Sequence, residues 1–247
     1  MNYKIKVNQV KKEESNLKGF ATVVFGEKFK ITNIAILNGK NGLYVQMPRY
    51  RTNELDENGK NIYRDFCNPT TKEFREELYG NILETYESTD FDEMYVGYRK
   101  GDTPAKMEYE TLVTPFEREG SAIRGLARIF FEDSFIVNNV SVLSGKDTEF
   151  VAMPSYRTNQ KDKDGRSVYQ DVCYPVTKEF REELYGNVLQ QYRKVKNKGV
   201  EEKVNEPKKE ENEKKTERKQ GDKSLKTSRG TKKSEAKEDL SDTPLKR

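Results

Sequence analysis

The residues best suited to chemistry are two arginines that stand in the same sequence context. Arg51 and Arg157 each follow a tyrosine and precede Thr-Asn in the heptapeptide Met-Pro-x-Tyr-Arg-Thr-Asn. A guanidinium group binds phosphate, and a tyrosine can stack on a base or hydrogen-bond a phosphate. The alternative is a surface turn in which each arginine pairs with an acidic neighbour. The candidate nucleic-acid-binding residues are Arg49, Tyr50, Arg51, Lys60, Tyr156, Arg157 and Arg166.

Catalytic and metal chemistry have little support in the sequence. The 247 residues include no histidine, which is the commonest general base and metal ligand. The two cysteines, Cys67 and Cys173, form no Cys-x-x-Cys motif and are expected to be small buried residues. Residues 162–165 resemble the start of a calcium loop, but their counterpart at 56–59 and the lack of a closing glutamate favour a turn. We therefore expect no enzyme, no metal and no cofactor.

Both arginines belong to an internal duplication with a constant offset of 106 residues. The heptapeptide at 47–53 recurs at 153–159, and the undecapeptide at 71–81 recurs unchanged at 177–187. From residue 19 to residue 86 the two copies align without a gap. The period is longer than the roughly 20 to 50 residues of solenoid repeats, so it predicts two complete domains.

The duplication divides the chain into four parts: domain 1 at 1–90, a linker at 91–106, domain 2 at 107–196 and a charged tail at 197–247. The tail has 16 basic and 12 acidic residues and few large apolar ones, so it is expected to be disordered. The rest of the chain has 30 of each sign. Affinity for a polyanion must therefore come from a local patch or from the tail.

Two further expectations concern the linker and the compartment. The linker aromatics Phe91, Tyr95 and Tyr98 suggest a segment that packs against the rest of the chain. No apolar run approaches the roughly 18 residues that span a bilayer, and the first ten residues lack the apolar block of a signal peptide. We expect a cytoplasmic protein with no membrane partner.

Each copy is expected to contain several antiparallel strands. Residues 3–7 alternate polar and apolar side chains, and the segments on either side of Gly26-Glu27-Lys28 are rich in β-branched and aromatic residues, as in a hairpin. Asn58-Gly59 predicts a tight turn. The expected strands of the first copy are 3–7, 20–25, 29–37, 43–47 and 62–66.

One helix is expected to close each copy, which gives an α+β fold of two small antiparallel sheet domains with one C-terminal helix each. Thr71 and Thr177 are the expected N-caps. An apolar stripe recurs every fourth residue from Phe74. Gly80 interrupts the helix, for which close backbone approach is one explanation, and the adjacent glutamates 76 and 77 are expected to be solvated.

The stretch Leu43–Thr52, continued by Tyr63–Pro69, resembles the SpoVG family (stage V sporulation protein G, or septation protein). The second copy resembles it too, at Phe150–Thr158 and Tyr169–Val172. The resemblance implies short bacterial domains with an antiparallel sheet and a helix. Such domains form dimers, bind DNA and in some members RNA, and influence septum formation, sporulation and gene expression.

The resemblance also implies a partner and a site. A chain with two such domains could supply both halves of a dimer, and DNA is the expected ligand, with RNA as a second candidate. The family's contact is attributed largely to a basic pair after Met-Pro-Ser, of which only the second member is present here, as Arg51 and Arg157. Self-association through sheet edges or helices is a further expectation. The alternative function is a non-catalytic module that binds a division or sporulation protein.

Overall fold

The computed structural model describes residues 1–11, 14–88, 96–98, 107–116 and 118–205. The expected disorder of the tail concerns mainly residues 206–247 and lies outside the described residues, as do linker residues Phe91 and Tyr95. The elements, in chain order, are β1 Tyr3–Gln9, β2 Leu17–Phe25, β3 Phe29–Gly39, β4 Gly42–Gln46, β5 Arg49–Leu55, β6 Asn61–Asp65, β7 Cys67–Pro69, α1 Lys72–Glu87, β8 Val96–Tyr98, β9 Tyr109–Pro115, β10 Ile123–Phe131, β11 Phe135–Ser144, β12 Glu149–Ala152, β13 Ser155–Lys161, β14 Ser167–Asp171, β15 Cys173–Pro175 and α2 Lys178–Asn205.

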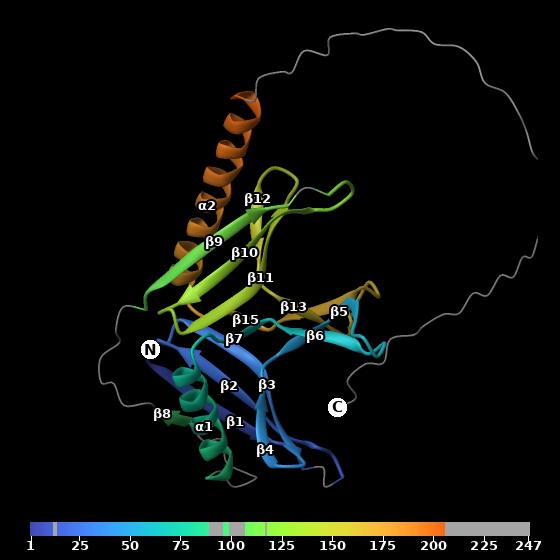
Figure 1. Ribbon diagram of the computed structural model, residues 1–247, viewed down its shortest axis with the longest axis vertical. Helices are drawn as coiled ribbons and strands as arrows, with labels where there is room; N and C mark the ends of the chain where they lie inside the picture. The colour runs from blue at the N-terminus through green and yellow to red at the C-terminus, as the bar shows by residue number, and fades with distance from the viewer. Residues whose placement is uncertain (12–13, 89–95, 99–106, 117, 206–247) are drawn as a thin grey trace, which may run out of the picture. The chain divides into compact units, whose positions relative to one another are not determined.

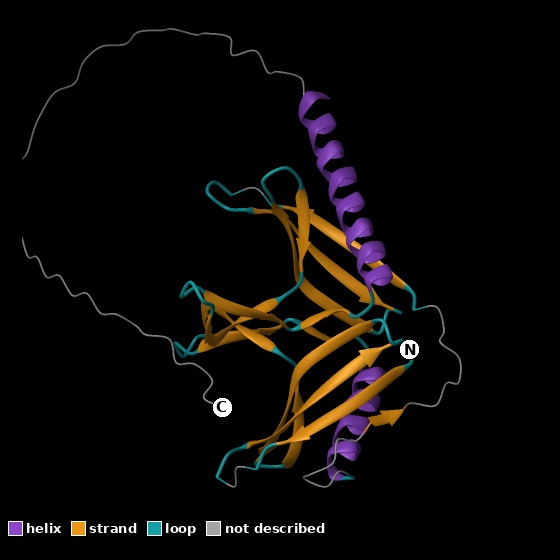
Figure 2. Cartoon of the chain, turned by 180° about the vertical axis from the view of Figure 1, so that it is seen from behind, coloured by secondary structure: helices purple, strands orange, loops and turns teal. Residues whose placement is uncertain are grey.

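Each copy builds one main antiparallel sheet and lays its helix on one face of that sheet (Figures 1 and 2). The first sheet has the order β15-β3-β2-β1-β8, with β4 also paired to β3. The second has the order β12-β11-β10-β9, with β7 also paired to β11. The buried side chains alternate along β2 and β10, as they must when only one face of a strand is covered. The predicted α+β fold of two tandem sheet-and-helix domains is confirmed.

The two copies exchange a short strand, which the sequence analysis did not predict. Strand β7 of the first copy pairs with β11 of the second, where Cys67 lies opposite Val137. Strand β15 of the second copy pairs with β3 of the first, where Cys173 lies opposite Ile31. Adjacent backbone bonds repeat the symmetry, since Asn138 N–H donates to the Phe66 carbonyl at 2.7 Å and the bond between the equivalent residues measures 2.8 Å. Each sheet is therefore completed by the other copy.

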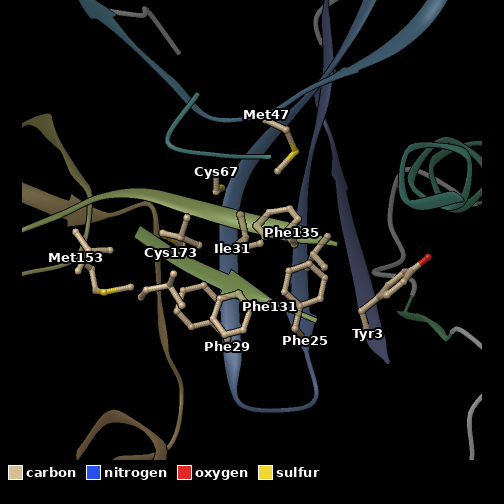
Figure 3. Packing of buried hydrophobic residues seen from close by; sticks show 14 of the residues in the cluster. Tyr3, Phe25, Phe29, Ile31, Met47, Cys67, Phe131, Phe135, Met153 and Cys173 are labelled. Atoms are coloured by element: carbon tan, nitrogen blue, oxygen red, sulfur yellow. The ribbon is translucent and has the colours of Figure 1, made fainter. Parts of the chain in front are cut away.

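The apolar core is continuous through this exchange (Figure 3). The Phe25 and Phe135 rings lie 4.9 Å apart, and the Phe29 and Phe131 rings lie 4.7 Å apart. All four side chains are fully buried. Because Phe131 and Phe135 are the counterparts of Phe25 and Phe29, the two ring contacts are one contact made twice, and each joins the first copy to the second.

The helices start as the sequence predicts. The Thr71 hydroxyl accepts a hydrogen bond from Phe74 N–H at 3.2 Å, and Thr177 does the same for Phe180. Each cap satisfies a backbone donor that the first helical turn leaves free. In the first copy, Phe74, Leu78 and Ile82 form the buried stripe against the sheet.

Two expectations for the helices are wrong. A Cβ atom at Gly80 or at Gly186 would meet nothing within 4 Å, so close backbone approach does not explain these glycines. Glu77 is not simply solvated, because it accepts a hydrogen bond from the Tyr3 hydroxyl at 3.0 Å. The Tyr3 hydroxyl in turn accepts one from Asn81 at 2.7 Å, which joins α1 to β1.

The chain after each helix differs between the copies. Residues 96–98 of the expected linker form β8, which pairs antiparallel with β1 and places Gly97 opposite Ile5. Helix α2 continues to Asn205, past residue 197, where the sequence predicted the tail to begin. Among the described residues, no helix is long and apolar enough to span a bilayer.

Candidate nucleic-acid interface

The candidate residues lie on two small hairpins, β5–β6 and β13–β14, each of which forms its own two-stranded sheet. In the first hairpin the Asp56 carboxylate accepts the backbone N–H groups of Asn58 and Lys60, both at 2.8 Å. Gly59 follows with φ of 74°, a left-handed conformation that favours glycine. Asp162 and Gly165 repeat this geometry in the second hairpin. The sequence resembling a calcium loop is thus a hydrogen-bonded turn.

A threonine of the repeated heptapeptide fixes the register of each hairpin. The Thr52 hydroxyl donates to the Ile62 carbonyl at 3.0 Å, and the Thr158 hydroxyl donates to the Val168 carbonyl at 2.9 Å. Both bonds lie where the ladder between the strands is interrupted. The threonine therefore holds the strands together at the irregularity and keeps the preceding arginine in a defined cross-strand pair.

That register pairs each arginine with an exposed tyrosine of the second strand. Arg51 lies opposite Tyr63, and Arg157 lies opposite Tyr169. Directly opposite residues share a face of the hairpin, so each hairpin presents a guanidinium beside a phenol ring. Both arginines are exposed, and Tyr63 and Tyr169 are 48% and 64% exposed. We refer to Arg51 with Tyr63, and Arg157 with Tyr169, as the two arginine–tyrosine pairs.

The sequence analysis missed Tyr63 and Tyr169. Counting back from the Asn58-Gly59 turn would not have found them, because a regular ladder places Phe66 opposite Arg51, and the irregularity between Arg51 and Leu55 shifts the register to Tyr63. The tyrosines it chose, Tyr50 and Tyr156, lie on the opposite face, since successive side chains of a strand alternate.

Those two inner tyrosines are engaged within the protein. The Tyr50 ring lies 4.8 Å from the Phe66 ring. The Tyr156 hydroxyl accepts a hydrogen bond from the Asn33 amide at 2.9 Å and donates one to Gln170 at 2.8 Å. Asn33 belongs to the first copy, so Tyr156 ties the second hairpin to the first sheet. Neither ring shares the face of an arginine–tyrosine pair.

The remaining candidates occupy other parts of the hairpins. The Arg49 guanidinium lies 4.7 Å from the centre of the Tyr63 ring, on the same face as Arg51. Its counterpart in the second copy is Ser155. Lys60 and Arg166 are exposed at the turns, and the Arg166 guanidinium lies 3.7 Å from the Asp164 carboxylate. The first hairpin thus gathers Arg49, Arg51 and Tyr63, whereas Lys60 lies at its tip.

Acidic residues moderate the charge of the hairpins. The segment 49–65 has four basic and four acidic residues, and 155–171 has four basic and three acidic ones. Arg64 pairs with Glu54 at 2.8 Å. Burial raises the pKa of Asp65, and the neighbouring Arg49 and Arg75 oppose that rise. Burial also raises the pKa of Asp171, which only Arg181 opposes. The two hairpins therefore carry little net positive charge.

The cysteines close the base of both hairpins. Cys67 and Cys173 follow β6 and β14, are fully buried, and form no disulfide. Burial raises the pKa of the Cys67 thiol well above its ordinary value, and a hydrogen bond with Cys173 raises it further. A thiol whose pKa is raised in this way is a poor nucleophile and a poor metal ligand. The prediction of small buried cysteines is confirmed.

The fold and the hairpins define a class: a small antiparallel sheet with one helix and a projecting hairpin, present twice and completed by strand exchange. The SpoVG family profile matches residues 1–88 and residues 107–194. The chain therefore belongs to the SpoVG family, and both copies are members of it.

Curated relatives carry a name but match one copy only. The protein named "Putative septation protein SpoVG" from Phytoplasma australiense is 35% identical over 83 residues, which cover 34% of this chain and 80% of the relative. Its namesake from Clostridium perfringens is 34% identical over 80 residues, or 32% of this chain and 82% of the relative. That from Treponema denticola is 32% identical over 76 residues, or 31% and 75%. Each relative is thus about the length of one copy, and its name refers to septation.

Proposed function

We propose that this chain is a non-catalytic regulator of septation or sporulation that acts in the cytoplasm and binds single-stranded nucleic acid through its two arginine–tyrosine pairs. The observation that carries the proposal is the repeated exposure of a guanidinium directly across from a tyrosine ring. Proteins that bind single strands combine cations along the backbone with aromatic rings on which bases stack. In a duplex the bases are already stacked on each other, so the tyrosines would add less.

The strand exchange supports the second part of the proposal, that one chain acts as an intramolecular pseudo-dimer. Strands β7 and β15 begin directly after the two hairpins and cross to the other copy. The hairpin bases are therefore tied to the shared core at the Cys67 and Cys173 positions. A ligand contacting both hairpins would meet two pairs that are held by one folded unit.

The test is a fluorescence titration of a labelled single-stranded oligonucleotide and its duplex at several salt concentrations. Replacing Arg51 and Arg157 together by alanine should weaken binding and make it less dependent on salt. Each lost phosphate contact should reduce the steepness of the log binding constant plotted against log salt concentration by about one. Arg193→Ala is the matched control, because it removes an exposed arginine from α2. It should leave the slope nearly unchanged.

A second pair of variants tests the tyrosines. Tyr63→Ala with Tyr169→Ala should weaken single-strand binding by roughly 5- to 150-fold for each base unstacked, and duplex binding by much less. Tyr50→Phe with Tyr156→Phe keeps the inner rings and should have little effect on either ligand. If the double arginine variant binds like the wild type while a chain ending at Asn205 does not bind, the tail binds the nucleic acid and the proposal fails.

A protein-interaction module is the second candidate, and the charge balance of the first hairpin favours it. Equal numbers of acidic and basic residues at 49–65 give little long-range attraction for a polyanion. This candidate would replace the first if no oligonucleotide binds at low salt, where phosphate contacts are strongest.

A further inference from the structure

The outer edges of the two main sheets are treated differently. In the first sheet the edge strand β1 is covered by β8, which pairs antiparallel around Ile5. In the second sheet the equivalent strand is β9, which has β10 on one side and, among the described residues, no strand on the other. The offset of 106 residues places the counterpart of β8 at 202–204, and those residues belong to helix α2. The segment that forms the covering strand β8 in the first copy is therefore helical in the second copy.

The hydrogen-bonding groups that β9 turns outward can be identified. Phe116 N–H donates to the Arg124 carbonyl, and Glu132 N–H donates to the Glu108 carbonyl. The pairing of β9 with β10 between these points has no irregularity. Hydrogen-bonded pairs alternate along an antiparallel ladder, so the even-numbered residues bond to β10. The N–H and C=O groups of Tyr109, Thr111 and Val113 consequently point away from the sheet.

Strand β1 carries two lysines that β9 lacks. In β1, Lys4 and Lys6 occupy the alternate positions, and lysines on an edge strand discourage pairing with other chains. Their counterparts in β9 are Glu110 and Leu112, and Leu112 is 48% exposed. Strand β9 also spans seven residues without a bulge. It retains none of the lysines that protect an edge.

The sequence of β9 suits antiparallel pairing with β9 of a second chain in a register centred on Thr111. In that antiparallel register Thr111 lies opposite Thr111 of a second chain, and Tyr109 lies opposite Val113 of that chain. Threonine pairs and aromatic–β-branched pairs are both favourable across strands. Glu110 lies opposite Leu112 of the second chain, so like charges do not face each other. Arg128 on β10 lies opposite Leu112 of β9. A cation is thus two strand spacings, roughly 9.5 Å, from the backbone of Glu110 in the second chain.

We propose that β9 is a docking edge at which two copies of this chain pair antiparallel, centred on Thr111. The outward groups of Tyr109, Thr111 and Val113 would form about six hydrogen bonds between the chains in this register. The two second sheets would join into one continuous sheet. The exchanged strands β7 and β15 pair with β11 and β3, away from β9, so the exchange is untouched and the dimer is one of complete chains.

Sedimentation equilibrium of the full chain over a range of concentrations tests the proposal. The wild type should reach twice its 28.8 kDa, and Glu110→Lys with Leu112→Lys, which copies the charges of β1, should stay a monomer. Glu119→Lys makes the first of these charge changes at an exposed site outside β9 and should dimerise like the wild type. A wild type that is monomeric throughout, or a dimer that tolerates the double lysine variant, would overturn the proposal.

Amide hydrogen exchange on the wild type gives a readout that does not depend on any variant folding. On dilution the Tyr109, Thr111 and Val113 amides should lose their protection, whereas the Leu112 amide, bonded to β10, should keep it. Protection of all four at every dilution would mean that the chain covers its own edge, which would overturn the proposal. Arg51→Ala with Arg157→Ala should dimerise normally, so this inference and the proposed nucleic-acid binding can fail separately.

Discussion

The two copies keep the same framework but differ in how each hairpin is secured. In the first copy Tyr50 packs on Phe66, whereas in the second Tyr156 bonds to Asn33 of the first sheet. The cross-strand register of the arginine–tyrosine pair is the same in both. In an assembly of identical chains every change appears twice. In a duplicated chain, each copy can change its supporting contacts while the exposed pair is retained.

The largest expected effect tests whether the copies are one folding unit. Phe25→Ala should lower the free energy of unfolding by about 3 to 5 kcal/mol, because it removes a fully buried ring that contacts Phe135 of the second copy. Phe131→Ala should cost a similar amount. Both variants should melt in a single transition by calorimetry and circular dichroism. A variant in which one copy melts before the other would show that the copies are energetically independent.

The next effect distinguishes the two hairpin supports. Asn33 and Asn139 both have φ near 60°, a conformation that asparagine tolerates better than most residues. Alanine at either position should therefore incur a similar backbone cost. Asn33→Ala should cost about 1 kcal/mol more, because it also breaks the bond to Tyr156. Denaturant melts of the two variants measure the difference, and equal losses would mean that the bond to Tyr156 contributes nothing.

The helix glycines should behave alike in the two copies. Gly80 and Gly186 have open space where a Cβ would lie, so alanine fits at both. Gly80→Ala and Gly186→Ala should each raise the free energy of unfolding by up to about 1 kcal/mol, because alanine has the better helix propensity. Urea melts of the single and double variants should show additive gains. A loss at either position would indicate that the glycine is needed for flexibility or a contact.

The smallest effect concerns the acidic residues at the hairpin bases. Arg49→Ser places a serine opposite Asp65, just as Ser155 lies opposite Asp171 in the second copy. Burial already raises the pKa of Asp65, and losing Arg49 should raise it further. A raised carboxyl pKa means that the folded protein binds the proton more tightly, so stability is lost as the pH rises through that pKa. Carboxyl NMR titration should show the upward shift at Asp65 and none at Asp171.

Periodic and local features could be predicted from the sequence, but contacts between the copies could not. Thr71 and Thr177 are recognisable as caps because capping depends on the next three residues. Strand β5 escaped prediction because none of its side chains is buried, so it lacks the apolar alternation of a core strand. Strand β7 has only three residues and its partner lies about 70 residues away, so nothing local identifies it.

The candidate site was predicted in part for the same reason. The repeated heptapeptide identified Arg51 and Arg157, because the repeat is visible in the sequence. The choice of Tyr50 and Tyr156 rested on adjacency along the chain. Adjacent residues of a strand point to opposite faces, whereas Tyr63 and Tyr169 reach the arginines through the cross-strand register. Which face of a hairpin is covered depends on the fold around it.

The strand exchange has a consequence for behaviour at low copy number. Had the same strands been exchanged between two separate chains, their association would depend on concentration, and dilution would separate them. Here the copies are joined by residues 89–106, so each meets the other at an effective concentration set by the length of that connection. The paired hairpins should therefore persist at any dilution at which the chain stays folded, even when a cell holds only a few copies.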